Sequence, residues 1–449
     1  MAKRHAAISV LIAILLGMHP ASVSADNPVD QLFTALRDNK FTEATQHFDT
    51  AMKSALSVDQ LSAVWLQIGA TYGKLEQWKV IQHGMLVGTD VYSLVLAFEH
   101  GKLSATVSVR PQTGEIAGLY FKPMTTETAA SSAPATSAPY ADATKFRLEA
   151  VTVGADPWKL PGTLTVPTGS GPFPAVVLLA GSGPNDRDES VGANHVFKDL
   201  AEGLSTRGIV VLRYDKRTYA YKTLDPQKIT VKEEVIDDGV AAVKLLRTRS
   251  EVAHDRIFVI GHSLGGMMAP EVAQKARPVA GVVLLAPVGR KLPAMIVQQM
   301  RYIGQASPKE LAELERQADE ISAHKMPPAQ YFFGAPASYY YDLDARNEVA
   351  IARGLDVPIL ILHGGRDYQV IDEDIRNWQN GLKGDAKVTV ETFPALNHLF
   401  IAGSGKPGPA EYDTPGHVAA AVIGTIASFI ANGGATTAGA LSAPQVASN

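Results

Sequence analysis

The chain has 449 residues, 46% of them hydrophobic and 19% charged, with a formal net charge of −4. This composition is typical of a globular protein with one large domain and a smaller one, and the negative charge argues against nucleic acid or an acidic membrane surface as the main partner. The chain contains no cysteine, which excludes disulfides, thiolate metal sites and a cysteine nucleophile.

Residues 1–25 have the pattern of a signal peptide. Lys3 and Arg4 precede an apolar run over residues 6–18, which is too short to span a bilayer, and Val23-Ser24-Ala25 resembles a cleavage site. A membrane anchor is the alternative, and the helix-breaking Pro20 argues against it. We therefore expect an exported protein, periplasmic or secreted, with no stable membrane insertion after the signal is removed.

Residues 26–123 predict a small α+β domain. Apolar residues recur at helical spacing over residues 29–37, 41–56 and 58–72. Alternating runs then follow over residues 91–98, 103–109 and 116–121, as in a meander of antiparallel strands. No catalytic pattern appears in this domain, so we expect it to serve in interaction, in dimerisation or in covering the substrate.

Residues 124–143 are rich in Ala, Ser, Thr and Pro and predict a linker to a second domain over residues 144–433. Val-, Ile- and Leu-rich strands alternate there with helices, which indicates a mostly parallel sheet covered on both faces, and so an α/β fold. The alternation breaks at about residues 290–354, where we expect a helical cap over the site. Residues 434–449 are small and polar, as in a disordered tail.

The central motif is Gly261-His-Ser-Leu-Gly265, which directly follows an apolar strand and opens a helix. This strand, G-x-S-x-G turn and helix form the nucleophile elbow of an α/β-hydrolase. The tight turn lifts a serine hydroxyl out of the sheet, where a base and a substrate can reach it. Gly261 and Gly265 are needed because a Cβ at either position would meet neighbouring backbone. The motif predicts Ser263 as the nucleophile.

The two other members of a catalytic triad should follow in the order acid, then histidine. Asp367 comes after the apolar strand 357–362 and a glycine turn, and His398 follows the last strand. We therefore assign His398 as general base and then acid, with Asp367 orienting and stabilising its imidazolium. Of the other histidines, His417 is interpreted as a capping or surface residue and His363 as structural. We expect the side chain of His262 to point away from the site.

An oxyanion hole requires two backbone N–H groups aimed at the developing negative charge. Leu264, directly after the nucleophile, is one candidate. The glycine-containing loop Ala180-Gly-Ser-Gly-Pro-Asn-Asp-Arg-Asp188 offers Ser182 as the other. Arg187, between two aspartates, predicts a local ion pair. A nucleotide-binding loop is excluded because position 186 is Asp and no P-loop Lys follows.

Four segments together resemble a family of bacterial α/β-hydrolase carboxylesterases, some of which carry a small N-terminal domain of unknown function. These segments are Leu179-Ala-Gly-Ser-Gly-Pro-Asn-Asp-Arg-Asp188, Arg213-Tyr-Asp-Lys-Arg217, Gly261-His-Ser-Leu-Gly-Gly266 and His363-Gly-Gly-Arg-Asp367. The resemblance implies hydrolysis of short- to medium-chain esters without a cofactor or metal. The chain departs from the family at Thr218-Tyr-Ala-Tyr221, in a loop expected to border the site, which leaves acyl or alcohol preference open.

Three functions remain open on these residues. The first is a serine carboxylesterase acting on a small-molecule ester through an acyl-enzyme at Ser263. The second is a peptidase or amidase on the same triad, for which Glu310, Glu313 and Glu315 offer acidic anchors if they are not simply the solvated face of a helix. The third is a binding protein on an inactive scaffold, which the survival of all three triad residues disfavours. The aromatic clusters Tyr331-Phe-Phe333 and Tyr339-Tyr-Tyr341 either line a pocket or pack the cap.

Overall fold

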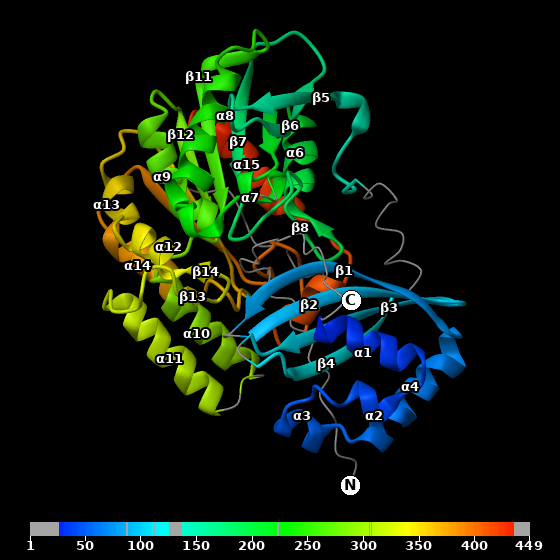
Figure 1. The fold of residues 1–449 in the computed structure, drawn as a ribbon. Helices are drawn as coiled ribbons and strands as arrows, with labels where there is room; N and C mark the ends of the chain where they lie inside the picture. The colour runs from blue at the N-terminus through cyan, green and yellow to red at the C-terminus, as the bar shows by residue number, and fades with distance from the viewer. Residues whose placement is uncertain are drawn as a thin grey trace, which may run out of the picture.

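A computed structural model describes residues 27–86, 89–111, 113–124, 137–221, 224–304, 306 and 308–434 (Figure 1). The predicted signal peptide lies outside the described residues, as do residues 125–136 of the predicted linker and residues 435–449 of the predicted tail. Those three interpretations stay predictions. In the described ranges, no helix has the length and apolar character needed to cross a membrane.

The N-terminal unit packs short helices against one antiparallel sheet with its own hydrophobic core. Neighbours in the chain are neighbours in the sheet, in the order β1-β2-β3-β4. The helices are α1 (Pro28–Arg37), α2 (Phe41–Ala44), α3 (Thr50–Ala55) and α4 (Val58–Tyr72), and the strands are β1 (Leu75–Leu86), β2 (Thr89–Phe98), β3 (Gly101–Val109) and β4 (Ile116–Met124).

Two details of this unit differ from the sequence prediction. The helix expected over residues 41–56 is broken, because the segment around Phe48 pairs with β4: the Asp49 N–H donates to the Ile116 carbonyl at 2.9 Å. The prediction also missed β1. This edge strand exposes charged residues such as Glu76 and Lys79, so its apolar alternation is weak.

The larger unit confirms the α/β-hydrolase fold. Within the described residues, eight strands form one sheet in the order β16-β15-β12-β11-β7-β10-β6-β5. In this sheet β6 pairs antiparallel with both β5 and β10. The other neighbouring pairs, which run in sheet order from β10 to β16, are parallel. The strands are β5 (Phe146–Val153), β6 (Leu160–Pro167), β7 (Phe173–Leu179), β10 (Val210–Tyr214), β11 (Val252–His262), β12 (Gly281–Leu285), β15 (Ile359–Gly364) and β16 (Val388–Phe393).

Helices pack on this sheet, α6 against α15 and α8 against α9 (Figure 1). These are α6 (Val196–Ser205), α8 (Asp238–Leu246), α9 (Leu264–Lys275), α14 (Asp372–Gly381) and α15 (Ala420–Ala431). A π-helical turn, Lys232–Asp237, leads into α8. Short elements are the strands β8 (Ser190–Val191) and β9 (Asn194–His195), the helix α7 (Arg217–Ala220), and 3-10 turns at Ala143–Lys145, Pro226–Lys228 and Pro409–Asp413.

The stretch between β12 and β15 forms the cap. It contains α10 (Leu292–Ile303), α11 (Pro308–Ser322), the hairpin β13 (Tyr331–Phe332) and β14 (Ala335–Pro336), then α12 (Ala337–Asp344) and α13 (Glu348–Arg353). Its aromatic cluster serves packing: the Tyr340 hydroxyl donates to the Phe332 carbonyl at 2.8 Å, and the Tyr339 hydroxyl donates to Glu234 at 2.7 Å. The end of the cap is thereby fixed to the main domain.

A charged cluster joins the cap to helix α9. Arg346 lies 3.0 Å from Glu271 of α9 and 2.8 Å from Asp342 of α12. Glu348 is buried beside them, and neither of its carboxylate oxygens has a hydrogen-bond partner among the described residues. Burial, and next the negative charge of Glu271, raise the pKa of Glu348 to about 8.

Replacing Glu348 by Gln should stabilise the protein at alkaline pH. The raised pKa means that folding takes up a proton, so the contribution of protonated Glu348 is fully present below its ordinary pKa and is lost as pH rises through about 8. Gln stays neutral, so Glu348→Gln should increase the free energy of unfolding at pH 9 by about 2–4 kcal/mol and change it little at pH 5. Urea unfolding at the two pH values measures both.

The matched control is Glu373→Gln, whose side chain is 55% exposed. It should shift the unfolding free energy by less than about 0.5 kcal/mol at either pH. A Glu348→Gln protein that gains no stability between pH 5 and pH 9, relative to the native chain, would contradict the assignment of a protonated Glu348.

Candidate active site

The elbow serine has the strained backbone that its motif predicts. Ser263 lies between β11 and α9 with φ 54° and ψ −116°. A Cβ on Gly261 would come within 2.0 Å of the Gly265 carbonyl oxygen, and one on Gly265 within 2.1 Å of the Leu179 carbonyl oxygen. Both glycines are therefore required for backbone to pass this close, and the turn holds Ser263 at the carboxyl end of the sheet.

His398 and Asp367 are directly bonded to each other. Nδ1 of His398 lies 2.6 Å from Oδ2 of Asp367, and both residues are buried. The other oxygen of Asp367 accepts the backbone N–H groups of Gln369 at 2.8 Å and Val370 at 2.9 Å. These bonds fix the carboxylate, which in turn fixes the ring so that Nε2 is left for a reacting group.

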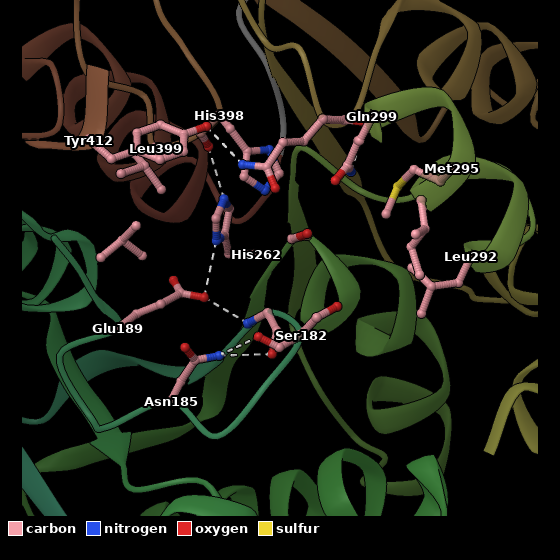
Figure 2. A pocket seen from close by; sticks show the side chains of 15 residues that line it. Ser182, Asn185, Glu189, His262, Leu292, Met295, Gln299, His398, Leu399 and Tyr412 are labelled. Carbon is pink, nitrogen blue, oxygen red and sulfur yellow. Dashed lines mark hydrogen bonds and ion pairs between the residues drawn. The ribbon is translucent and has the colours of Figure 1, made fainter. Parts of the chain in front are cut away.

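One pocket brings Ser263 and His398 together with the glycine-containing loop that follows β7 (Figure 2). The pocket, counted together with the solvent space at its open mouth, spans about 660 Å³. Helix α10 of the cap contributes Leu292, Met295 and Ile296 to its wall. The predicted nucleophile and base therefore face a cavity with one largely apolar wall.

The loop after β7, residues 180–189, is called the oxyanion loop below. A Cβ on Gly181 would lie 3.2 Å from the Ser263 Cβ, so this loop passes close to the predicted nucleophile. Ser182 lines the pocket, and its N–H has no hydrogen-bond acceptor among the described residues. Leu264 is the first residue of α9, where an N–H has no partner within the helix. Both N–H groups are thus available to a ligand.

Buried side chains clamp the oxyanion loop. The Gly181 carbonyl accepts from Lys216 Nζ at 2.7 Å and from the Asn185 side chain at 3.0 Å. Lys216 is 3% exposed and lies 3.5 Å from Glu234. Further ion pairs brace the same region: Arg187–Asp215 at 2.8 Å, Arg213–Asp188 at 2.7 Å and Arg217–Asp238 at 2.5 Å. The segment 213–217, noted in the sequence only as part of a resemblance, is the support of this loop.

The prediction that the His262 side chain points away from the site is wrong. Figure 2 shows His262 between Glu189 and His398. Its Nε2 lies 2.9 Å from the His398 carbonyl oxygen, and its ring centroid is 4.6 Å from that of His398. Sequence spacing could not place it, because its partner is 136 residues away in the chain. Nothing in the sequence singled out Glu189 either.

Other candidates lie elsewhere. His363 bonds the Val370 carbonyl oxygen through Nε2 at 3.1 Å, a structural contact, and His417 pairs with Asp199 at 3.0 Å. None of residues 218–221 is among the described residues that line the pocket, so this loop does not border the site as expected. Glu310, Glu313 and Glu315 lie on α11, which also contributes no residue to the described pocket wall.

Comparison with known proteins gives two matches along the chain. The family model described as "Serine aminopeptidase, S33" matches residues 192–402, a range that contains Ser263, Asp367 and His398. Esterase EstD of Thermotoga maritima is 40% identical over 399 residues, covering 88% of this chain and 92% of that protein. Because 399 residues exceed the length of the predicted catalytic domain, this alignment also takes in much of the N-terminal unit.

Solved structures with partial likeness include two esterases. Est1E of Butyrivibrio proteoclasticus covers 63% of this chain and 98% of its own, with 17% identity and a TM-score of 0.44. The Pyrococcus furiosus esterase PF2001 covers 57% of this chain and 84% of its own, with 20% identity and a TM-score of 0.41.

Replacing Lys216 by Met should impair catalysis through the oxyanion loop. Met keeps most of the stem but removes the N–H donors, which leaves the Gly181 carbonyl and Glu234 without that partner. A loop displaced by a fraction of an ångström misdirects the Ser182 N–H, so kcat for an ester should fall by about ten- to a hundred-fold. Steady-state kinetics beside a thermal melt measure the effect on activity and on stability.

Lys159→Met is the control, since Lys159 forms an ion pair with Asp156 in which both side chains are more than half exposed. It should leave kcat and the melting temperature unchanged. If Lys216→Met kept native kcat in folded protein, the clamp would have no role in catalysis.

Proposed function

The chain belongs to the α/β-hydrolase esterase family, and we propose that it hydrolyses short- to medium-chain carboxylic esters through an acyl-enzyme on Ser263. Its esterase relative is 40% identical along nearly its whole length. The observation that carries the residue assignment is the 2.6 Å contact between His398 and Asp367 at a pocket that Ser263 also lines.

In the first half-reaction, His398 Nε2 takes the proton of the Ser263 hydroxyl as its oxygen bonds the ester carbonyl carbon. The carbonyl oxygen becomes an oxyanion, which the N–H groups of Ser182 and Leu264 receive. Collapse breaks the bond to the alcohol oxygen, and His398 returns its proton to that oxygen. The alcohol leaves and the acyl group stays on Ser263.

In the second half-reaction, water repeats the attack. His398 takes a proton from the water as its oxygen bonds the acyl carbon, and the same N–H groups receive the oxyanion. Breakage of the bond to Ser263 returns the proton to the serine oxygen and releases the acid. Asp367 stays ionised and stabilises the imidazolium each time it forms.

Amide hydrolysis on the same triad is the second candidate, favoured by the family model described as a serine aminopeptidase. An aminopeptidase needs a carboxylate to hold the substrate ammonium. Among the described residues that line the pocket, Glu189 is the only acid, and its Oε1 is occupied by the Gly181 N–H at 2.6 Å and by His262 at 3.1 Å. Glu189 is 2% exposed, so its second oxygen is buried away from a substrate ammonium, and the apolar wall supports the ester.

Fluorophosphonate labelling beside kinetics with p-nitrophenyl esters of graded chain length tests the proposal. We expect labelling of the native protein, turnover of the short esters, and loss of both in Ser263→Ala. His398→Ala should lower kcat by about 10⁴-fold or more, since the base and the acid are lost together.

Turnover of aminoacyl p-nitroanilides in place of esters would replace the ester proposal by the amidase. Labelling that persists in Ser263→Ala would exclude Ser263 as the nucleophile. A folded native protein that neither labels nor turns over an ester would favour the binding-scaffold alternative.

Helix α10 should set the chain-length preference, because Met295 contributes to the pocket wall and is 5% exposed. Met295→Ala lengthens the cavity, so the ratio of kcat/KM for a longer acyl ester to that for a short one should rise by about ten-fold. The control is Met300→Ala on the same helix: Met300 is also buried but is not among the described lining residues, and the ratio should stay unchanged. Equal effects of the two variants would contradict this role of α10.

A further inference from the structure

A second buried acid–histidine pair lies beside the triad, and the reaction above gives it no task. Glu189 and His262 are 2% and 3% exposed, and Nδ1 of His262 lies 3.1 Å from Oε1 of Glu189. Nδ1 forms no well-aligned hydrogen bond with a described residue, so its contact with Glu189 is an ion pair when the ring is protonated. Figure 2 shows the pair extending from the oxyanion loop to His398.

The geometry places a proton on both ring nitrogens of His262. Nε2 lies 2.9 Å from the His398 carbonyl oxygen, which can only accept. Nδ1 faces a carboxylate oxygen that already accepts the Gly181 N–H at 2.6 Å, so this oxygen acts as an acceptor as well. An unprotonated Nδ1 would leave two electron-rich atoms 3.1 Å apart with no proton on either. These two contacts favour the imidazolium form of His262.

The charges around His262 support this state. Burial by itself lowers the pKa of His262, but the charge of Glu189, the bond to the His398 carbonyl and the charge of Asp367 outweigh it, and the pKa is raised. The titratable groups that face the ring are Glu189 from the oxyanion loop, His398 from the loop after β16 and Asp367 from the loop after β15. Two of the three are acids, which favour the charged ring.

Glu189 occupies its position beside His262 with a strained backbone conformation. Its φ is 47°, in the left-handed region that residues with a Cβ rarely adopt, and its Oε2 is buried without a hydrogen-bond partner among the described residues. Strain and an unsatisfied oxygen persist only where the surroundings enforce them, and they gather at functional sites.

We propose that Glu189 and His262 form a positioning pair, distinct from the triad, that holds the oxyanion loop in register with the loop of the general base. Glu189 receives the Gly181 N–H, and the next N–H along the chain is that of Ser182 in the oxyanion hole. His262 donates to the main chain of His398 itself. The hole and the base are thereby set at a fixed spacing across Ser263. This inference rests on the proposed triad and oxyanion hole.

The pair makes the spacing depend on pH. Since the pKa of His262 is raised, the ring keeps its charge to a higher pH than an ordinary histidine and loses a proton as pH rises through that pKa. The neutral ring then loses its contact with either Glu189 or the His398 carbonyl, so kcat should fall on the alkaline side of the pH profile. The acid limb of the profile reports protonation of the general base and is a separate event.

Glu189→Gln tests the pair while keeping its shape. Without the carboxylate, the buried ring gives up its proton at lower pH. We expect kcat for a p-nitrophenyl ester to fall by about ten- to a hundred-fold, KM to change by less than about three-fold, and the alkaline limb to move to lower pH. His262→Gln should show a similar loss of kcat, but with no alkaline limb from this group, because an amide does not titrate.

Asp188→Asn is the matched control in the same loop. Asp188 pairs with Arg213 at 2.7 Å and braces the loop without reaching His398. We expect a lower melting temperature and an alkaline limb at its native position. A shift of that limb as large as in Glu189→Gln would mean that any loosening of the loop has this effect, and it would overturn the specific role of the pair.

Two further results distinguish failure of the positioning pair from failure of the proposed esterase function. If Ser263→Ala abolishes labelling while Glu189→Gln keeps the native kcat and pH profile, the positioning pair is excluded and the esterase stands. If labelling does not depend on Ser263, the proposed function itself fails. Should Glu189→Gln not fold, a nitrogen-15 NMR titration of Ser263→Ala protein reads His262 directly. A ring that loses its second proton at higher pH than an ordinary histidine supports the pair, and one that loses it at lower pH overturns it.

Discussion

The close passage of backbone at Gly261 and Gly265 is the constraint on which the site depends. It permits the strained φ of 54° at Ser263, and it sets this residue at the carboxyl end of β11. The parallel neighbours of β11 end at the same edge, so the loops after β7, β15 and β16 all arrive beside one hydroxyl. The sheet therefore brings the proposed acid, the proposed base and the oxyanion loop to one place.

Around that point the molecule concentrates buried charge on the oxyanion loop, whose proposed catalytic groups are backbone N–H groups. Burying an ion pair costs desolvation that its attraction only partly returns, so these pairs are weak evidence of stability. What they supply is orientation: Lys216 and Glu189 hold the two polar ends of the Gly181 residue, and neither depends on substrate. A hole arranged before the substrate arrives needs little reorganisation when the oxyanion forms.

The chemistry and the selectivity draw on different parts of the fold. Strand ends and the loops after them supply the reacting groups, whereas α10 of the cap supplies an apolar wall. The rest of the cap is fixed through buried tyrosines and the cluster around Arg346, so its aromatic residues serve packing rather than binding. Under the proposed function, changes in α10 would therefore alter substrate preference without disturbing the proposed triad.

The sequence by itself determined the fold class, the esterase family and the short-range features of the site, because an elbow and a strand-then-loop order are local patterns. It indicated Ser263, and through chain order it led to Asp367 and His398, which the tertiary structure bonds at 2.6 Å. The sequence did not predict the partners of Lys216, the direction of the His262 side chain or the weakly alternating edge strand β1. The partner of a buried charge is set by proximity in space and not by spacing in the chain. His262 contacts a carbonyl 136 residues away, which only the packing of the sheet brings near.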